Sequence, residues 1–404
     1  MVAVDLAADL LHGSVAPGFE RVQAEFRRNF EERSELGAAC TIFHRGEKVV
    51  DLWGGYRDPQ KRLPWQEDTL CIVQSVTKGL AAMTLAMLHS RGDLDYEERV
   101  ATYWPEFEQN GKAQITVRQL LSHQAGLPCL EEGWDWDTLS DLDALAVVLA
   151  RQRPIWEPGT RHGYHAMNLG LYENELVRRV DPQHRSLGRF FKEEIAEPLG
   201  IEFYIGLPED VPTERIAQVQ WPNPVTAVLQ MMLKDIRASR FAFAMMNPKS
   251  MTTRAFSFTK GGAMAGDIDN PRYRGVEFAS TGGIGRASAI ALAYSAFATR
   301  EGELGVSRNT LEMLAAADRE PTEGIFDLVL KAEYRHSLGF GKPCPSFPIG
   351  RSSRSFGWGG LGGYMGYADP DDQVGFGYTM NRLSFQTGGD SRVTALMNAF
   401  YSCI

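Results

Sequence analysis

The chain has 404 residues, of which 44% are hydrophobic and 23% charged, an ordinary composition for a globular protein. Its formal net charge of −9 argues against a nucleic-acid partner, because such proteins carry basic patches. The sequence contains no run of 18 or more apolar residues, so we expect no transmembrane helix. A chain this long can bury a large core without a disulfide or a metal ion.

The N-terminus and the cysteines favour a cytoplasmic protein. Asp5 and Asp9 stand in a leader that has no basic start and no long apolar stretch, so we expect no signal peptide. The five cysteines are scattered, odd in number and without a CxxC pair, which is typical of buried thiols in a reducing compartment. They are Cys40, Cys71, Cys129, Cys344 and Cys403.

The first predicted elements are a helix and a hairpin. An amphipathic pattern over 17–34 predicts the helix. Two β-like runs at 38–44 and 48–53 are joined by the turn Arg45-Gly46-Glu47, which predicts a hairpin. The next apolar run, 75–91, has helical spacing and is followed by Gly92, a typical helix stop.

The middle of the chain is mainly helical by pattern. Further helices are predicted at 117–121, 142–151, 168–180 and 187–194. Two glycine-rich segments, 261–262 and 282–285, lack the strand-before, helix-after context of a nucleotide-binding loop. We interpret both as loops near the rim of a pocket.

The C-terminal part returns to strands at 364–369 and 374–380, before a last helix at 391–401. Strands at both ends of the chain predict an α+β fold: one antiparallel sheet built from both termini and flanked by helices, with an all-helical lobe inserted. The expected domains are 1–70 with 320–404 for the sheet, and 71–319 for the mainly helical part.

One four-residue pattern carries candidate chemistry. Ser75-Val76-Thr77-Lys78 is an S-x-x-K at the start of a helix, which puts Ser75 and Lys78 on one face. A serine hydroxyl needs a neighbour that takes its proton, and Lys78 can do so if burial lowers its pKa. The free N–H groups at a helix start would make the Ser75 amide an oxyanion donor. A helix cap followed by an exposed lysine would give the same pattern.

Three later segments support the catalytic interpretation: Leu120–Pro128 (LLSHQAGLP), Trp156–His165 (WEPGTRHGYH) and Phe356–Tyr364 (FGWGGLGGY). With the S-x-x-K, and in this order, they resemble the serine β-lactamase and penicillin-binding-protein superfamily. They are most similar to its class C-like branch of family VIII carboxylesterases and fungal statin side-chain acyltransferases. The resemblance covers about residue 36 to the C-terminus. It implies a β-lactamase/transpeptidase-like α/β sandwich and a serine acyl-enzyme mechanism.

The resemblance also implies roles for single residues. Ser75 matches the nucleophile, Lys78 its helix partner and Tyr164 the tyrosine of the second motif. Beside a Lys78 ammonium the anion of Tyr164 would be favoured, so the phenol would act as a general base and later as an acid. The alternative for Tyr164 is an aromatic anchor in a glycine-rich loop.

The third motif is altered. Trp358-Gly359-Gly360 stands where the family has a lysine or histidine, a small residue and a glycine, and the amide of Leu361 aligns with the second oxyanion donor. The glycines would let a substrate lie close to the strand edge. We expect His165, beside Tyr164, among the substrate-binding residues. A plain glycine-rich turn is the alternative for 358–360.

Two departures bear on the substrate. Ala166 stands where the β-lactamase pattern has an asparagine, and Trp358 replaces a cation that in β-lactamases helps to hold the substrate carboxylate. Losing that cation favours uncharged esters over penicillin-like acids.

The sequence therefore predicts a cofactor-free carboxylesterase acting on a small-molecule ester. No G-x-S-x-G occurs, and the HxxH spacing of His162 and His165 lacks a third ligand cluster, so we expect no metal. An acyltransferase, a hydrolase of β-lactams or D-amino-acid amides, and a non-catalytic scaffold of the same fold stay open. The natural substrate and a homo-oligomeric state stay open as well.

Overall fold

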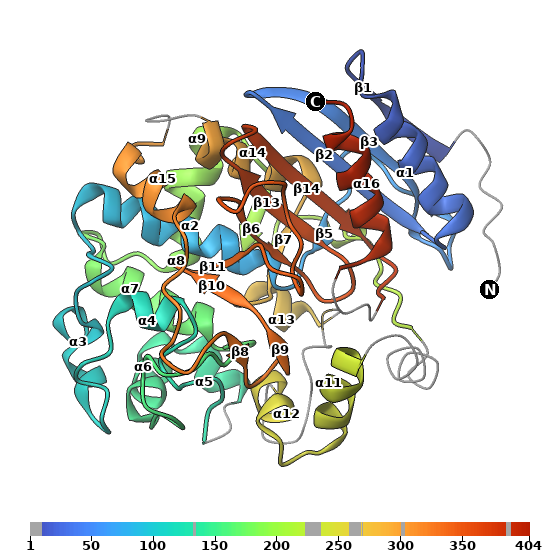
Figure 1. The fold of residues 1–404 in the computed structure, drawn as a ribbon. Coiled ribbons are helices and arrows are strands. Elements are labelled where there is room, and N and C mark those ends of the chain that lie inside the picture. Colours follow the sequence, from blue (N-terminus) through green and yellow to red (C-terminus); the bar gives the residue numbers. More distant parts are fainter. Residues whose placement is uncertain are drawn as a thin grey trace.

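The computed structural model describes residues 10–131, 135–222, 236–257, 268, 270–299, 304–384 and 389–404. Helices and an antiparallel sheet combine in a mixed α+β fold, as the sequence predicts (Figure 1). The glycine pair at 261–262 lies outside the described residues. In the described segments, no helix is both long enough and apolar enough to cross a membrane.

The main sheet joins strands from both ends of the chain. Its spatial order is β1 (Leu11–Val15), β3 (Glu47–Asp58), β2 (Gly37–His44), β14 (Val374–Met380), β13 (Met365–Asp369), β12 (Phe356–Gly359), β11 (Phe340–Lys342) and β10 (Arg335–Ser337), with β4 (Leu63–Pro64) beside β3. β2 and β3 form the predicted hairpin. β14 pairs antiparallel with β2, with Tyr378 opposite Cys40, so the C-terminal strands close against the N-terminal hairpin.

Alternate residues of β14 face opposite sides of the sheet. On one side α14 (Ala287–Thr299) packs so closely that a Cβ at Gly375 would lie only 2.3 Å from the carbonyl oxygen of Ala291. On the other side the Tyr378 hydroxyl bonds Glu35, which pairs with Arg392 of α16 (Ser391–Tyr401). The two glycines of β14 thus permit a helix to lie directly on the strand.

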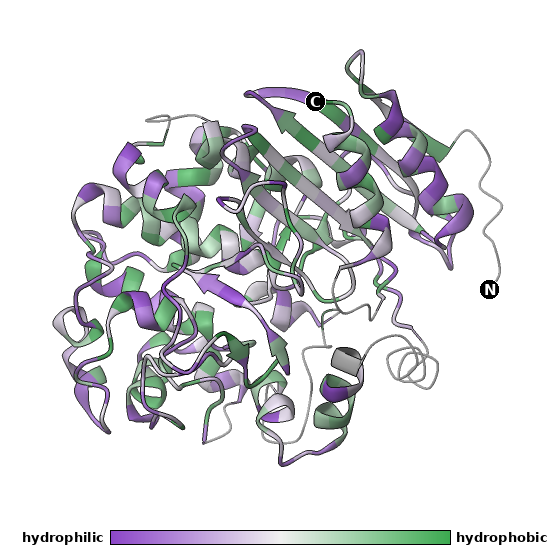
Figure 2. Ribbon diagram, in the orientation of Figure 1, coloured by the Kyte–Doolittle hydropathy of each residue, from purple (hydrophilic) through white to green (hydrophobic). Residues whose placement is uncertain are grey.

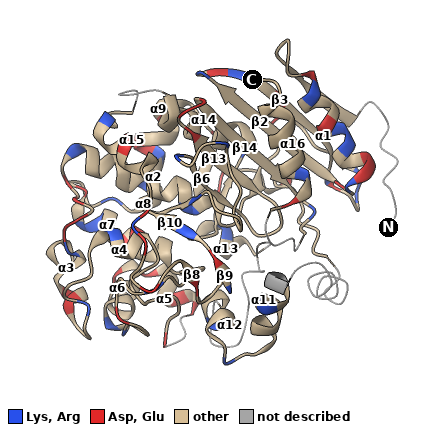
Figure 3. Ribbon diagram, in the orientation of Figure 1, with Lys and Arg blue, Asp and Glu red and all other residues tan. Residues whose placement is uncertain are grey.

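α1 (Glu20–Glu32) and α16 lie side by side over the sheet (Figure 1). α1 is amphipathic: Val22, Phe26 and Phe30 are buried, and Figure 2 shows the helix otherwise largely hydrophilic. Charged residues gather on such outer helices, whereas the central strands carry few (Figure 3). This is the pattern of a surface helix that covers a core.

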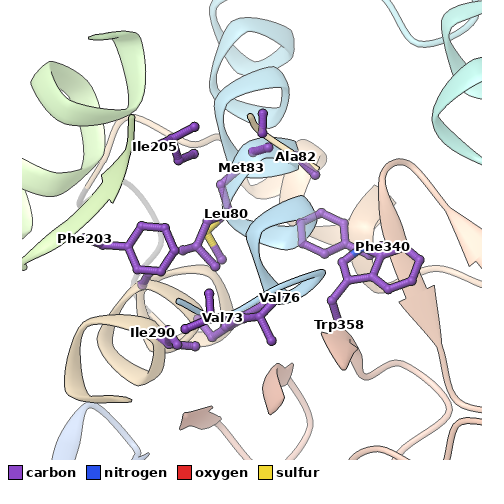
Figure 4. Packing of buried hydrophobic residues seen from close by; sticks show 14 of the residues in the cluster. Val73, Val76, Leu80, Ala82, Met83, Phe203, Ile205, Ile290, Phe340 and Trp358 are labelled. Carbon is purple, nitrogen blue, oxygen red and sulfur yellow. The ribbon is translucent and has the colours of Figure 1, made fainter. Parts of the chain in front are cut away.

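α2 (Val76–Arg91) is different, because it is buried on all sides. Every residue from Val76 to Leu88 is buried, and Gly92 ends the helix in a left-handed conformation with φ 83°. Apolar side chains from several elements surround it, among them Phe203, Ile290 and Phe340 (Figure 4). A helix that is apolar all round is stable only in such a core, which fixes its first turn rigidly.

The predicted helices of the middle part are confirmed as α4 (Val117–Leu121), α6 (Leu142–Arg151) and α7 (Leu169–Val180). α8 (Leu187–Phe191) ends earlier than predicted and continues as a π-type turn over Lys192–Ala196. Further α-helices among the described residues are α3 (Val100–Tyr103), α5 (Trp136–Ser140), α9 (Glu197–Leu199), α11 (Ile236–Met246), α12 (Met251–Phe256), α13 (Pro271–Gly275) and α15 (Arg308–Ala315).

The prediction of a loop at 282–285 is wrong. Gly283–Gly285 form β7, which pairs with β5 (Cys71–Ile72) and β6 (Phe203–Ile205) in a small sheet. The glycines make room for the Phe203 ring, because a Cβ at Gly285 would lie 2.3 Å from it. The carbonyl oxygen of Gly283 in β7 also accepts the N–H of Val73, so the small sheet holds the segment that directly precedes α2.

Two further expectations meet the structure only partly. Cys40, Cys71 and Cys129 are buried as expected, but Cys344 and Cys403 are half-buried. The domain bounds at 70/71 and 319/320 stay a prediction, and α14, which lies inside 71–319, packs on β14 and β2 of the main sheet.

Candidate active site

Ser75 stands at a strained entry to α2. Gln74 before it has φ 51°, in the left-handed region that a non-glycine residue adopts at a cost of about 1 to 2 kcal/mol. Ser75 is the N-cap residue, yet its side chain makes no capping bond. Its hydroxyl is therefore free to face Tyr164 and Lys78.

Lys78 lies one turn further on and is fully buried. Its Nζ is 2.7 Å from the carbonyl oxygen of Ala166, 2.9 Å from that of Ser280 and 3.3 Å from Oγ of Ser75. Burial lowers the pKa of Lys78 to about 7, although the charge of Glu173 opposes this. A neutral amine has two N–H donors and one lone pair, so the two carbonyls leave the lone pair for the Ser75 hydroxyl.

Tyr164 completes the group. Its hydroxyl donates to Oγ of Ser75 at 2.7 Å, and Nζ of Lys78 lies 5.0 Å from its ring centre. Burial raises the pKa of Tyr164, and the bond to Ser75 opposes that shift only partly. The phenol is therefore protonated at neutral pH, contrary to our expectation that its anion is favoured.

The third-motif residues Trp358, Gly359 and Gly360 lie near Tyr164 and the segment before Ser75. The indole N–H of Trp358 donates to the carbonyl oxygen of Gly339 at 2.5 Å, and its ring lies 5.5 Å from that of Tyr164. A Cβ at Gly360 would lie 2.5 Å from the carbonyl oxygen of Val73, so this glycine backs onto the chain just before Ser75. Gly359 is the last residue of β12, and the ring of Phe347 lies beside it.

The two expected oxyanion donors are the amides of Ser75 and Leu361. Among the described residues, neither amide donates a hydrogen bond to another group of the chain. Leu361 follows Gly360 directly, so the close approach of Gly360 to Val73 brings the two amides to the same end of α2. Both amides therefore remain available to an acceptor from outside the chain.

His165, expected among the substrate-binding residues, lies in the protein interior. It is fully buried, its Nδ1 lies 2.7 Å from the carbonyl oxygen of Gly163, and its ring lies 5.2 Å from that of His123. Burial lowers the pKa of His165 to about 4, so its ring is neutral at pH 7. This placement makes it part of the packing behind Tyr164.

A buried histidine cluster lies behind Tyr164 that the sequence did not suggest. It comprises His123, His162, His165 and His336. The ring of His336 is nearly parallel to that of Tyr164, at 6.2 Å. Within the described part of the chain, no three His, Cys, Asp or Glu side chains are arranged to hold a metal ion.

Asp327 is a second residue that sequence reasoning missed. Its Oδ1 accepts the N–H groups of Tyr164 at 3.2 Å and of Val329 and Leu330 at 2.8 Å. Burial favours its neutral form, but the His336 ring and these N–H donors hold the pKa of Asp327 below its ordinary value. Asp327 lies in the short strand β8 (Phe326–Asp327), 163 residues from Tyr164. Because the two residues are so far apart in sequence, no local pattern predicts their contact.

Known proteins resemble most of the chain. Residues 26–398 match the family model described as Beta-lactamase. The curated protein "Esterase/beta-lactamase LipL" of Mycobacterium tuberculosis is 33% identical over 379 residues, which cover 92% of this chain and 83% of that protein.

Solved structures agree with this similarity. A family VIII carboxylesterase is 34% identical, with a TM-score of 0.85, and the match covers 98% of this chain and all of that one. A penicillin-binding-protein homologue from Caulobacter crescentus is 33% identical, with a TM-score of 0.82 over 98% of this chain and all of that one. Proteins named for esterase activity and for penicillin binding thus share the fold described above.

Proposed function

Because this chain belongs to the beta-lactamase family, we propose that it hydrolyses carboxylic esters through an acyl-enzyme on Ser75. The observation that carries the proposal is the position of the Ser75 Oγ, 2.7 Å from the Tyr164 hydroxyl and 3.3 Å from Nζ of Lys78. A hydroxyl between a neutral amine and a phenol has both a proton acceptor and a proton donor at hand.

In the first step Oγ of Ser75 attacks the ester carbonyl carbon and its proton passes to Nζ of Lys78. Lys78 can take it without moving, because an ammonium has three N–H donors for the three acceptors already around it. The amides of Ser75 and Leu361 would hold the negative oxygen of the tetrahedral intermediate.

In the second step the intermediate collapses and the alkoxide leaves. Tyr164 gives its phenol proton to the alkoxide and takes one from Lys78, which becomes neutral again, so the net result is the transfer of one proton from Ser75 to the alcohol. In deacylation the same groups work in reverse: water gives a proton to the Tyr164–Lys78 pair, attacks the acyl carbon, and Ser75 recovers its hydroxyl.

An ester is favoured over a β-lactam because of Trp358. Its indole N–H is already bonded to Gly339, and its ring packs beside Tyr164 and His336, so it offers no charge to a substrate carboxylate. The names of the similar proteins include esterases, which supports the same choice.

The test is a comparison of substrates with purified protein. Wild type should hydrolyse a p-nitrophenyl acyl ester faster than nitrocefin, and Ser75→Ala should lose both activities. A fluorophosphonate probe should label wild type at Ser75. Faster turnover of nitrocefin would refute the ester preference, and an unlabelled Ser75 would point to the non-catalytic scaffold. Product analysis with an added alcohol would distinguish hydrolysis from acyl transfer.

A further inference from the structure

α11 and α12 form a helical pair whose aromatic side chains reach the candidate active site. The ring of Phe256, at the end of α12, lies 6.1 Å from the ring of Tyr164. The ring of Phe241, on α11, packs edge-on against Phe256 at 5.7 Å. Figure 1 shows the two helices next to each other at the edge of the molecule, near β8.

The pair is fixed to the segment that positions Tyr164. The hydroxyl of Thr252, on α12, donates to the carbonyl oxygen of Val329 at 2.8 Å. Val329 belongs to the turn whose N–H groups bond Asp327, and Asp327 in turn accepts the N–H of Tyr164. α12 and Tyr164 are therefore held by one connected piece of structure.

Three other rings of the described residues also contact Tyr164. The rings of His336, Trp358 and His123, all of them buried, pack against Tyr164 from the protein interior. Phe256 is half-buried, so among these four rings it is the one that both contacts Tyr164 and is partly exposed.

We propose that Phe256, backed by Phe241, is a specificity-determining residue that forms an apolar wall for the alcohol portion of the ester. The proposal rests on the proposed function, in which Tyr164 gives its proton to the leaving alkoxide. The group bonded to that oxygen must therefore lie beside Tyr164, where Phe256 stands. The acyl portion is bonded to the carbonyl carbon that Ser75 attacks and not to the leaving oxygen.

The wall suits an apolar alcohol. The rings of Phe241 and Phe256 contact each other directly, so the surface that these two side chains form beside Tyr164 is apolar. Apolar surface that leaves water against an aromatic ring is favourable at roughly 25 cal/mol per Å². Esters of longer alkyl or aromatic alcohols are thus the substrate class that the wall favours.

Two isomeric substrates separate the two sides of the ester. Hexyl acetate carries its alkyl chain on the alcohol, and methyl heptanoate carries a chain of similar length on the acyl group. Phe256→Ala should lower kcat/KM for hexyl acetate about tenfold and leave methyl heptanoate within about twofold, because only the first chain would touch the wall. Phe256→Leu, which keeps apolar volume, should lie between wild type and Phe256→Ala.

Phe243 offers a matched control. It lies on α11 but is 58% exposed, so Phe243→Ala should change neither substrate. Equal losses on both isomers, or no loss on either, with Phe256→Ala or Phe256→Leu would overturn the inference. A wild-type protein that hydrolyses neither isomer and is not labelled at Ser75 would instead refute the proposed function.

Discussion

The Tyr164 hydroxyl and the Ser75 Oγ, 89 positions apart in sequence, lie 2.7 Å from each other. Burial keeps the phenol protonated while it brings the pKa of Lys78 down to about 7. The two partners of Ser75 therefore start in complementary states, with Lys78 able to take a proton and Tyr164 able to give one.

Tyr164→Phe removes only the hydroxyl that donates to Ser75. We expect kcat/KM for an ester to fall by about 10² to 10⁴, the usual contribution of a positioned proton donor. The melting temperature should change little, since the ring keeps its packing against His336 and Trp358. Ester kinetics and a thermal melt would check this. An activity within threefold of wild type would show that Tyr164 is not the proton donor.

The activity should depend on pH through Lys78. Only the neutral amine can take the proton of Ser75, so kcat/KM should rise with pH and level off above about 7. The raised pKa of Tyr164 should keep the phenol protonated well into the alkaline range. A pH profile of ester hydrolysis measures both the rise below pH 7 and the plateau above it. Lys78→Arg, which carries a permanent charge and cannot deprotonate, should be inactive at every pH. A profile that is flat from pH 5 to 9 would contradict the role of Lys78.

Asp327→Ala should impair both folding and activity. The N–H groups of Tyr164, Val329 and Leu330 would lose their acceptor, and each buried unsatisfied group costs about 1 to 3 kcal/mol. Asp327→Asn keeps an acceptor oxygen and should be milder. Urea unfolding and ester kinetics would measure the two effects. Asp143→Ala, at an exposed ion pair, is the control and should leave both unchanged.

Gly79→Ala should destabilise the protein although alanine is the better helix former. A Cβ at Gly79 would lie 1.9 Å from the Tyr294 hydroxyl, and overpacking of this kind costs about 1 to 3 kcal/mol. In the background of Tyr294→Phe the same substitution should cost less, because the clashing oxygen is gone. A double-mutant cycle by chemical denaturation tests the coupling, and equal costs in both backgrounds would contradict it.

Arg392→Met should uncouple a buried charge cluster. Arg392 pairs with Glu35 at 2.9 Å and with Asp390 at 2.7 Å, and removing one partner of such a cluster costs about 3 to 5 kcal/mol. Burial already raises the pKa of Glu35, whereas Arg392 outweighs burial and keeps the pKa of Asp390 low.

The sign of the pH effect on this variant follows from these shifts. Without Arg392, burial would raise the pKa of both carboxyl groups, so they take up protons as the pH falls and the unpaired charge disappears. The stability deficit relative to wild type should therefore shrink from pH 7 to pH 5. Urea unfolding at both pH values measures it, and a constant deficit would show that lost packing, not charge, is responsible.

The sequence alone was sufficient for elements whose pattern is local. The hairpin predicted at 38–44 and 48–53, the helices 117–121, 142–151 and 391–401, and the strand 374–380 are confirmed because periodicity and turn residues act over neighbouring positions. The S-x-x-K motif also placed Ser75 and Lys78 on one helix face, since their spacing along a helix is fixed by its geometry.

Only the tertiary structure decided what depends on distant segments. Gly283–Gly285 form a strand in the structure, although glycines in sequence suggest a loop, because the ring of Phe203 packs against them. The tertiary structure also decided the protonation states, since the pKa values of Lys78 and Tyr164 depend on burial, which a sequence motif does not specify. The hydrogen bond of Tyr164 to Asp327 and its ring contact with Phe256 join distant segments of the chain, so no local pattern could have predicted them.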